Sequence, residues 1–113
     1  MKQSSRIERV AAVLKDCDNY TVGLETIQTF FAFLSENLKL PCEVVTAGEY
    51  ERYQLDAINN SENELFGLLG KVKLLADDKR LSMIPLCDLK AVDNRSKNFD
   101  LLNTYAEWFI NYQ

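Results

Sequence analysis

The sequence predicts an α+β fold in which two helices precede a small antiparallel sheet and one helix follows it. Apolar residues recur at intervals of three and four before Pro41, alternate in short runs from 42 to 86, and return to helical spacing after Asn98. Helices and strands are therefore grouped, which favours α+β over a parallel α/β sheet. We expect one domain over 1–113, with a helical part at 1–40, a β part at 41–90 and a C-terminal helix at 97–112.

Polar capping residues mark the first and last helices. Ser5 followed by Glu8 makes a capping box, which predicts a helix over 6–15. Asn98 is a suitable N-cap for the last helix, predicted over 98–111.

The second helix carries the longest apolar stripe of the chain. Thr21 is a candidate N-cap, and the helical spacing continues over 22–38. Proline disfavours α geometry in the residue before it, so the helix should end before Pro41.

The β part is predicted from short alternating runs separated by turn residues. We expect strands at 42–45, 51–58, 65–76 and 80–86, with turns at 47–48 and 77–79. Gly67 and Gly70 fall within one run, which indicates a bulge or a sharp bend.

Apolar positions shared by these elements predict the core. We expect it to contain Leu24, Ile27, Phe31, Leu34, Val44, Leu55, Val72, Ile84, Leu102, Tyr105 and Phe109. Cys17, Cys42 and Cys87 are odd in number and widely spaced, which predicts buried thiols and argues against a disulfide framework or a zinc site.

Composition excludes several classes of function. A net charge of −4 is the wrong sign for holding nucleic acid through its phosphates. The absence of histidine excludes Ser-His and Cys-His nucleophile pairs and histidine zinc sites. No apolar run approaches the ~20 residues of a membrane span, so we expect a cytoplasmic protein that does not bind a membrane. From the charge and the missing histidine we also expect that it binds no nucleic acid and is not an enzyme.

Carboxylates are the abundant candidate ligands. Asp16 does not begin an EF-hand loop, because Thr21 and Ile27 stand where glycine and a bidentate glutamate are needed. The stretch from Glu43 to Glu64 is rich in acids and asparagines, a composition that fits either a calcium site or the solvated rim of a small sheet.

Several short segments of the chain form a recognisable set, which reads LPCEV at 40–44, LFGL at 65–68, GKV at 70–72, PLCDL at 85–89, VD at 92–93, SKNFDLL at 96–102 and YAEWF at 105–109. Together these segments resemble the CcbP-type small bacterial calcium-binding proteins. The similarity covers about residues 24 to 109, and its most specific part is PLCDL followed by VD and YAEWF.

This resemblance implies an SH3-like small barrel with helical additions, and an acidic surface that binds calcium without an EF-hand. The acids that match the shared motifs are Glu43, Asp88 and Asp93, of which Asp88 has a structural alternative as the cap of a turn.

We expect calcium (Ca2+) to be the ligand, and we place the ion from the spacing of the acids. The short turn at 47–48 should bring Glu43 close to the carboxylates that follow it, which predicts Glu43, Glu49, Glu51 and Asp56 as metal ligands. The resemblance adds Asp88 to the predicted ligands. Asp88 with Asp93 is the next location to test.

A second function stays open beside calcium binding. The same fold would serve as a protein-interaction module that binds no metal and presents Tyr50, Tyr53 and Phe66 to a partner.

Overall fold

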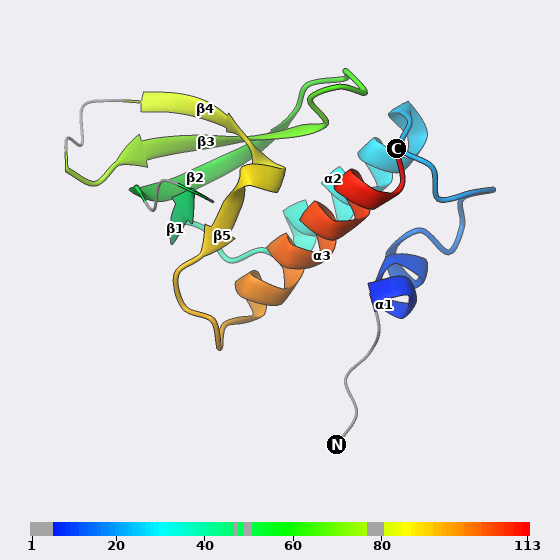
Figure 1. The fold of residues 1–113 in the computed structure, drawn as a ribbon, viewed down its shortest axis with the longest axis horizontal. Helices are drawn as coiled ribbons and strands as arrows, with labels where there is room; N and C mark the ends of the chain where they lie inside the picture. The colour runs from blue at the N-terminus through cyan, green and yellow to red at the C-terminus, as the bar shows by residue number, and fades with distance from the viewer. Residues whose placement is uncertain (1–5, 47, 49–50, 77–80) are drawn as a thin grey trace.

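The computed structural model describes residues 6–46, 48, 51–76 and 81–113, and it has an α+β fold (Figure 1). Its elements in these residues are α1 (Arg6–Val13), α2 (Leu24–Asn37), β1 (Cys42–Thr46), β2 (Arg52–Asn60), β3 (Leu68–Leu74), β4 (Leu81–Pro85), a one-turn 3-10 helix η1 (Leu86–Asp88), β5 (Leu89–Ala91) and α3 (Lys97–Asn111). The predicted grouping of helices and strands is confirmed.

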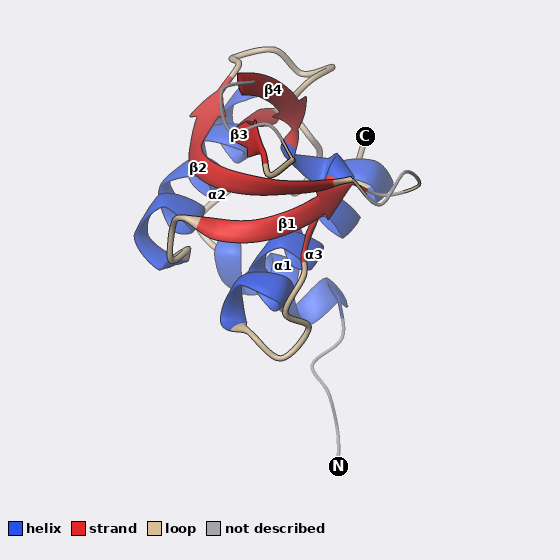
Figure 2. Ribbon diagram, turned by 90° about the vertical axis from the view of Figure 1, so that its left-hand side faces the viewer, coloured by secondary structure: helices blue, strands red, loops and turns tan. Residues whose placement is uncertain are grey.

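The five strands form one antiparallel sheet in the order β4-β3-β2-β1-β5. Figure 2 shows this sheet as curved, and the strand order makes β4 and β5 its two edges. No ladder joins these edges within the described residues, so the sheet is open and the expectation of a closed barrel was wrong. Strand β5 has only three residues, and all of them pair with β1, which leaves β4 without a second partner strand.

Helices α2 and α3 pack on the sheet and on each other, and α1 packs on α3 and α2 (Figure 1). An aromatic cluster joins them: the Phe30 ring of α2 stacks on Trp108 of α3 with centroids 4.6 Å apart, and it meets Tyr105 edge-on at 5.6 Å. Such pairs add to the free energy gained by burying the rings. No helix in this part of the chain is long and apolar enough to span a bilayer.

The predicted core is confirmed at most positions and wrong at a few. Ile27, Leu34, Val44, Leu55, Val72, Leu102, Tyr105 and Phe109 are buried. Leu24 is 54% exposed, and Phe31 and Ile84 are only partly buried. The buried face of α2 is centred on Ile27, Phe30 and Leu34, so the stripe through Phe31 lies at its margin.

Two helix starts differ from the prediction because other side chains form the caps. Gly23 is the N-cap of α2, where its N–H donates to the Thr26 hydroxyl, which donates in turn to the Thr21 carbonyl. Ser96 caps α3, accepting the Phe99 N–H at 3.1 Å. Ser5, the predicted cap of α1, lies outside the described residues.

The β part differs from the prediction in its third and last strands. The third strand begins at Leu68, because Leu65 and Phe66 belong to a turn that ends at Gly67, whose φ is +62°. Strand β5 was missed, since three residues are too few to show alternation. Gly48 lies in a turn as predicted, whereas Ala47 and the turn at 77–79 fall outside the described residues.

Candidate functional site

Two strands bring oxygen-bearing side chains together on one face of the sheet. Glu43 of β1 lies directly opposite Gln54 of β2, and cross-strand partners point to the same face. The Gln54 amide donates to Asp56 Oδ1 at 2.7 Å. These three side chains, Glu43, Gln54 and Asp56, form what we call the oxygen strip.

Asp56 lies at a β-bulge of β2. Leu55 lies opposite Val72 and Ala57 lies opposite Lys71, so Asp56 is an extra residue on β2 with no partner of its own on β3. Asp56 follows Gln54 by two residues, and strand alternation places both side chains on the same face. Leu55 remains buried in the core while the Asp56 carboxylate bonds to Gln54.

Two basic side chains flank the strip. Arg52 Nη1 donates to Glu43 Oε2 at 2.6 Å, with both side chains substantially exposed. Lys73 of β3 lies opposite Gln54 on the other side of β2. An exposed ion pair of this kind stabilises the fold only slightly, but it occupies one oxygen of Glu43, and a cation at the strip would compete with Arg52 for it.

The other predicted ligands lie apart from the strip. Glu51 precedes β2, and its backbone carbonyl accepts the Thr46 N–H at 3.2 Å. Asp88 ends η1, where its carboxylate accepts a hydrogen bond from the Cys87 thiol at 3.8 Å. Glu49 lies outside the described residues. Among the described residues no three Asp, Glu, Cys or His side chains converge to hold a metal ion.

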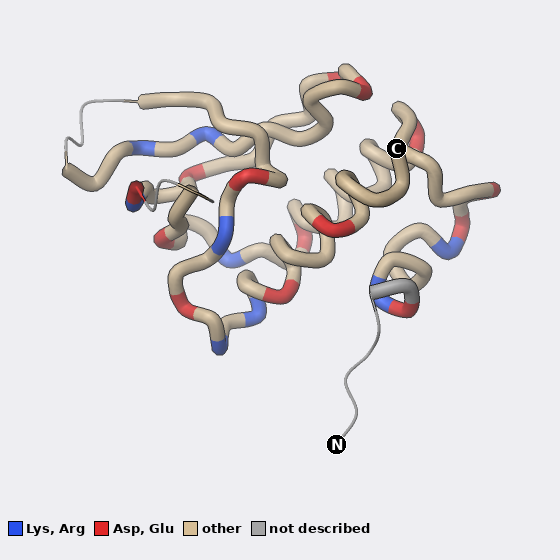
Figure 3. The backbone as a smooth tube through the Cα atoms, in the orientation of Figure 1, with Lys and Arg blue, Asp and Glu red and all other residues tan. Residues whose placement is uncertain are grey.

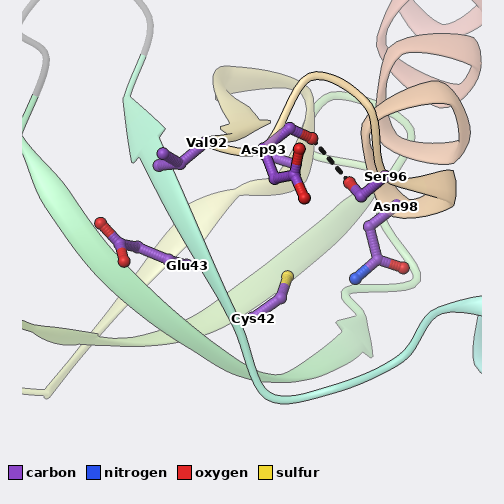
Figure 4. A pocket seen from close by; sticks show the side chains of 7 residues that line it. Cys42, Glu43, Val92, Asp93, Ser96 and Asn98 are labelled. Atoms are coloured by element: carbon purple, nitrogen blue, oxygen red, sulfur yellow. Dashed lines mark hydrogen bonds between the residues drawn. The ribbon is translucent and has the colours of Figure 1, made fainter.

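A cavity of about 240 Å³ lies beside the strip, between β1, the end of β5 and the start of α3. Its lining includes Cys42, Glu43, Asp93, Ser96 and Asn98 (Figure 4). The Asp93 carbonyl accepts the Ser96 hydroxyl at 2.7 Å, and Asp93 Oδ1 accepts the Arg95 N–H at 3.0 Å. Figure 4 shows the Glu43 carboxylate pointing away from that of Asp93, so the two acids share the lining without converging.

Comparison with known proteins identifies the architecture. No family model matches the chain, and no curated protein matches it. A solved structure, the crystal structure of Anabaena CcbP, superposes with a TM-score of 0.71 over 96% of this chain and 91% of that chain, at 14% sequence identity. The chain has the CcbP fold. The likeness spans almost the whole chain, whereas the motifs that predicted it cover about residues 24 to 109.

In the CcbP fold of this chain the thiols of Cys42 and Cys87 are held protonated at neutral pH. Cys17, Cys42 and Cys87 are unpaired and only partly buried, so the prediction of buried thiols is confirmed only in part. Burial raises the pKa of Cys42, partly offset by a hydrogen bond from Asn98. Burial and then the Asp88 carboxylate raise the pKa of Cys87 to about 11. Neither thiol is therefore an activated nucleophile.

In the CcbP fold, Tyr53 and Phe66, two residues predicted for the alternative protein-interaction surface, are separated from each other. Tyr53 lies near the start of β2 and packs partly against the core, whereas Phe66 follows the end of β2 in the loop to β3. The two rings are at opposite ends of the β2–β3 hairpin and share no surface. Tyr50 lies outside the described residues.

Sequence reasoning missed Gln54 and Arg52 as members of the site. Arg52, Gln54 and Asp56 recur at intervals of two, which places them on one face of a strand. That signal was present in the sequence. Their position next to Glu43 depends on the register across the β1–β2 turn, and periodicity alone does not define that register.

Proposed function

We propose that this chain is a non-enzymatic calcium-binding protein, acting as a buffer or sensor, and that the oxygen strip of Glu43, Gln54 and Asp56 contributes ligands. The observation that carries the proposal is the CcbP fold over 96% of the chain. It joins the sequence resemblance to CcbP-type calcium-binding proteins, in which Glu43 is one of the matching acids. A cytoplasmic location and an SH3-like character of the open sheet belong to the same proposal.

The donor types of the strip suit calcium. Calcium takes six to eight oxygen ligands from carboxylates, amide or backbone carbonyls and water, and it tolerates irregular geometry. The strip offers two carboxylates and one amide oxygen. Glu49, which was predicted as a further ligand, stays a prediction, and water would complete the coordination.

The flanking cations predict how this binding behaves. A calcium ion at Glu43 must displace the Arg52 guanidinium from the carboxylate or share the carboxylate with it. The guanidinium lies 2.6 Å from the carboxylate oxygen in an exposed setting. Exposed charges are screened by salt over about 8–10 Å. The affinity should therefore be modest and should fall as ionic strength rises.

The absence of an enzymatic function remains part of the proposal. The chain has no histidine, and the two thiols with shifted pKa values are held protonated by burial. Acid–base chemistry by two carboxylates needs their pKa values to be driven apart, and the exposed surface around Glu43 offers no such burial.

Amide NMR spectra recorded during calcium addition to chelator-treated protein test the location of the ion. The proposal expects the largest shifts at 43 and 52–56, and it expects them to shrink in a Glu43→Gln, Asp56→Asn double variant. Asp18→Asn is the matched control, because it removes a carboxylate from the exposed connection between α1 and α2. Equal shifts in the double variant would refute the strip, and shifts centred on 88–93 would move the site to Asp88 and Asp93.

A further inference from the structure

The connection between β2 and β3 presents two large apolar side chains to solvent. Leu65 is 80% exposed and Phe66 is 53% exposed. Both lie in the loop 61–67, the green loop between β2 and β3 that projects at the top of Figure 1. Single exposed apolar residues are common, but adjacent ones on a projecting loop mark a candidate contact surface.

This loop is fixed by its own hydrogen bonds. The Gly67 carbonyl accepts the Ser61 N–H at 3.1 Å and the Ser61 hydroxyl at 2.7 Å. The Asn63 side chain accepts the Leu65 N–H at 2.7 Å, and the Asn63 carbonyl accepts the Gly67 N–H at 2.8 Å. Leu65 and Phe66 are therefore held outward by a preorganised backbone, which lowers the entropic cost of binding a partner.

The base of the loop is held against α3. Gly67 has a φ of +62°, and a Cβ at this position would collide with the Tyr105 hydroxyl and the Phe109 ring. The Tyr105 hydroxyl also accepts the Leu68 N–H at 2.8 Å. Glu62 keeps a φ of +57°, which is unusual for a residue with a side chain. A strained backbone persists where the surroundings define it, and such sites are often functional.

A third exposed apolar side chain lies on α2, the helix that is hydrogen-bonded to the base of this loop. Leu24 begins α2 and is 54% exposed. Gln28, one turn further along the same helix face, accepts a hydrogen bond from Asn60 at 2.9 Å, which ties this face of α2 to the base of the loop. Leu24, Leu65 and Phe66 form what we call the end patch.

The charged residues next to the end patch in the sequence are all acidic. Glu25 follows Leu24, while Glu62 and Glu64 precede Leu65. The segments 16–38 and 53–70 contain no Lys or Arg. Figure 3 shows the same pattern, with acidic and no basic positions along the loop and the first turn of α2.

We propose that the end patch docks a basic amphipathic helix of a protein partner. The apolar side chains would fill the helix's apolar stripe, and Glu25, Glu62 and Glu64 would face its Lys and Arg residues. The patch lies on a loop and a helix, so it offers no strand edge for backbone pairing. Like charges oppose docking of a second copy, and they oppose an anionic lipid surface.

The test uses a synthetic helix of about 18 residues with a leucine stripe and lysines elsewhere, long enough to hold helical structure. A matched peptide carries glutamate in place of lysine. Binding is followed by amide NMR in chelator-containing buffer, so the outcome is independent of calcium. The proposal expects the lysine peptide to shift the signals of 24–25 and 62–66, and expects the glutamate peptide to bind at least about tenfold more weakly.

Variants separate this surface from others of similar exposure. The Leu65→Ser, Phe66→Ser double variant should bind the lysine peptide at least about tenfold more weakly. Both side chains are exposed in the wild type, so the thermal midpoint of unfolding should change little. Leu81→Ser is the matched control, since Leu81 is 58% exposed on the edge strand β4. Glu62→Lys with Glu64→Lys should reverse the preference between the peptides.

Several results would overturn the proposal. One is that the Leu65 and Phe66 double variant binds the lysine peptide as tightly as the wild type. Another is that Leu81→Ser weakens this binding as much as the double variant does. A third is that the lysine and glutamate peptides bind equally well. Self-association of the wild type that the double variant abolishes would assign the patch to a second copy. Binding to phosphatidylcholine vesicles without binding to the lysine peptide would assign it to a membrane surface.

Discussion

The side chain of Asn98, in the first turn of α3, binds both backbone polar groups of Lys39. Its Nδ2 donates to the Lys39 carbonyl at 2.9 Å, and its Oδ1 accepts the Lys39 N–H at 3.0 Å. Asn98 is only 7% exposed. This pair of bonds fixes the segment between α2 and β1, and so positions the start of β1, where Glu43 lies, relative to α3.

Removing this side chain should destabilise the fold. Asn98→Ala leaves a donor and an acceptor of Lys39 without partners in a partly buried setting, which should cost about 2–3 kcal/mol of unfolding free energy. Asn98→Asp should cost at least as much, because it places a carboxylate oxygen against the Lys39 carbonyl. Urea denaturation measures both. A loss under about 0.5 kcal/mol for either variant would show that water replaces the bonds freely.

Phe30 should be the more sensitive of two adjacent phenylalanines in α2. It is fully buried and stacks on Trp108 at 4.6 Å, whereas Phe31 is partly buried. Phe30→Ala should cost about 3–5 kcal/mol, because it leaves a cavity between α2 and α3. Phe31→Ala should cost less than half as much. The reverse order in chemical denaturation would mean that α2 is rotated about its axis.

Phe30 and Phe31 show how far the periodicity of apolar residues predicts the buried face of a helix. The stripe of α2 was predicted through Leu24 and Phe31; the end of the helix before Pro41 was confirmed, whereas the helix begins at Leu24 rather than at residue 22. Phe30 lies 100° from Phe31 on the helix, so two adjacent phenylalanines leave the phase undetermined. The phase depends on Trp108, which is distant in sequence and meets Phe30 only in the folded chain.

Tyr105 should make stability depend on alkaline pH. Burial raises the pKa of the Tyr105 phenol well above its ordinary value, although the Leu68 N–H bond lowers it. Below pH about 10 the phenol is neutral in both states, and above it only the unfolded chain ionises, so stability falls as pH rises. Cys42 and Cys87, whose pKa values are also raised, should add to this fall from pH about 9.

Tyr105→Phe isolates the phenol's share. At pH 7 the variant should lose about 1–3 kcal/mol, because the buried Leu68 N–H loses its acceptor. Above pH about 10 the difference from the wild type should shrink, since phenylalanine has no proton to lose in the unfolded state. Urea denaturation series from pH 7 to 11 measure this difference. A constant difference across that range would show that Tyr105 ionises equally in both states.

The candidate site was predicted less completely than the fold. Glu43 and Asp56 share a face because the β1–β2 register places Gln54 opposite Glu43, and Asp56 follows Gln54 by two residues at a bulge. Neither the register nor the bulge follows from alternation, which is unchanged by a shift of two residues. Glu51 was counted with them from its spacing and Asp88 from the resemblance, and among the described residues neither joins a group of three acids or thiols that could hold a metal ion.

Arg52 should weaken calcium binding. Its guanidinium occupies Oε2 of Glu43 at 2.6 Å, so Arg52→Gln removes a competing cation while keeping a polar side chain. An exposed pair of this kind contributes up to about 1 kcal/mol, which predicts an affinity about two- to fivefold higher. Lys15→Gln, with the same change of net charge at a site distant in the sequence, is the control. Equal gains in both variants would indicate an effect of net charge alone.

Calorimetric titration of calcium into chelator-treated protein tests the central claim most directly. The measurement compares the wild type with the Glu43→Gln, Asp56→Asn variant at an ionic strength of about 0.15 M. We expect a saturable heat for the wild type that weakens at least about tenfold in the variant, because two carboxylate ligands are lost. No heat from the wild type at millimolar calcium would contradict calcium binding, and an unchanged affinity in the variant would contradict its location at Glu43 and Asp56.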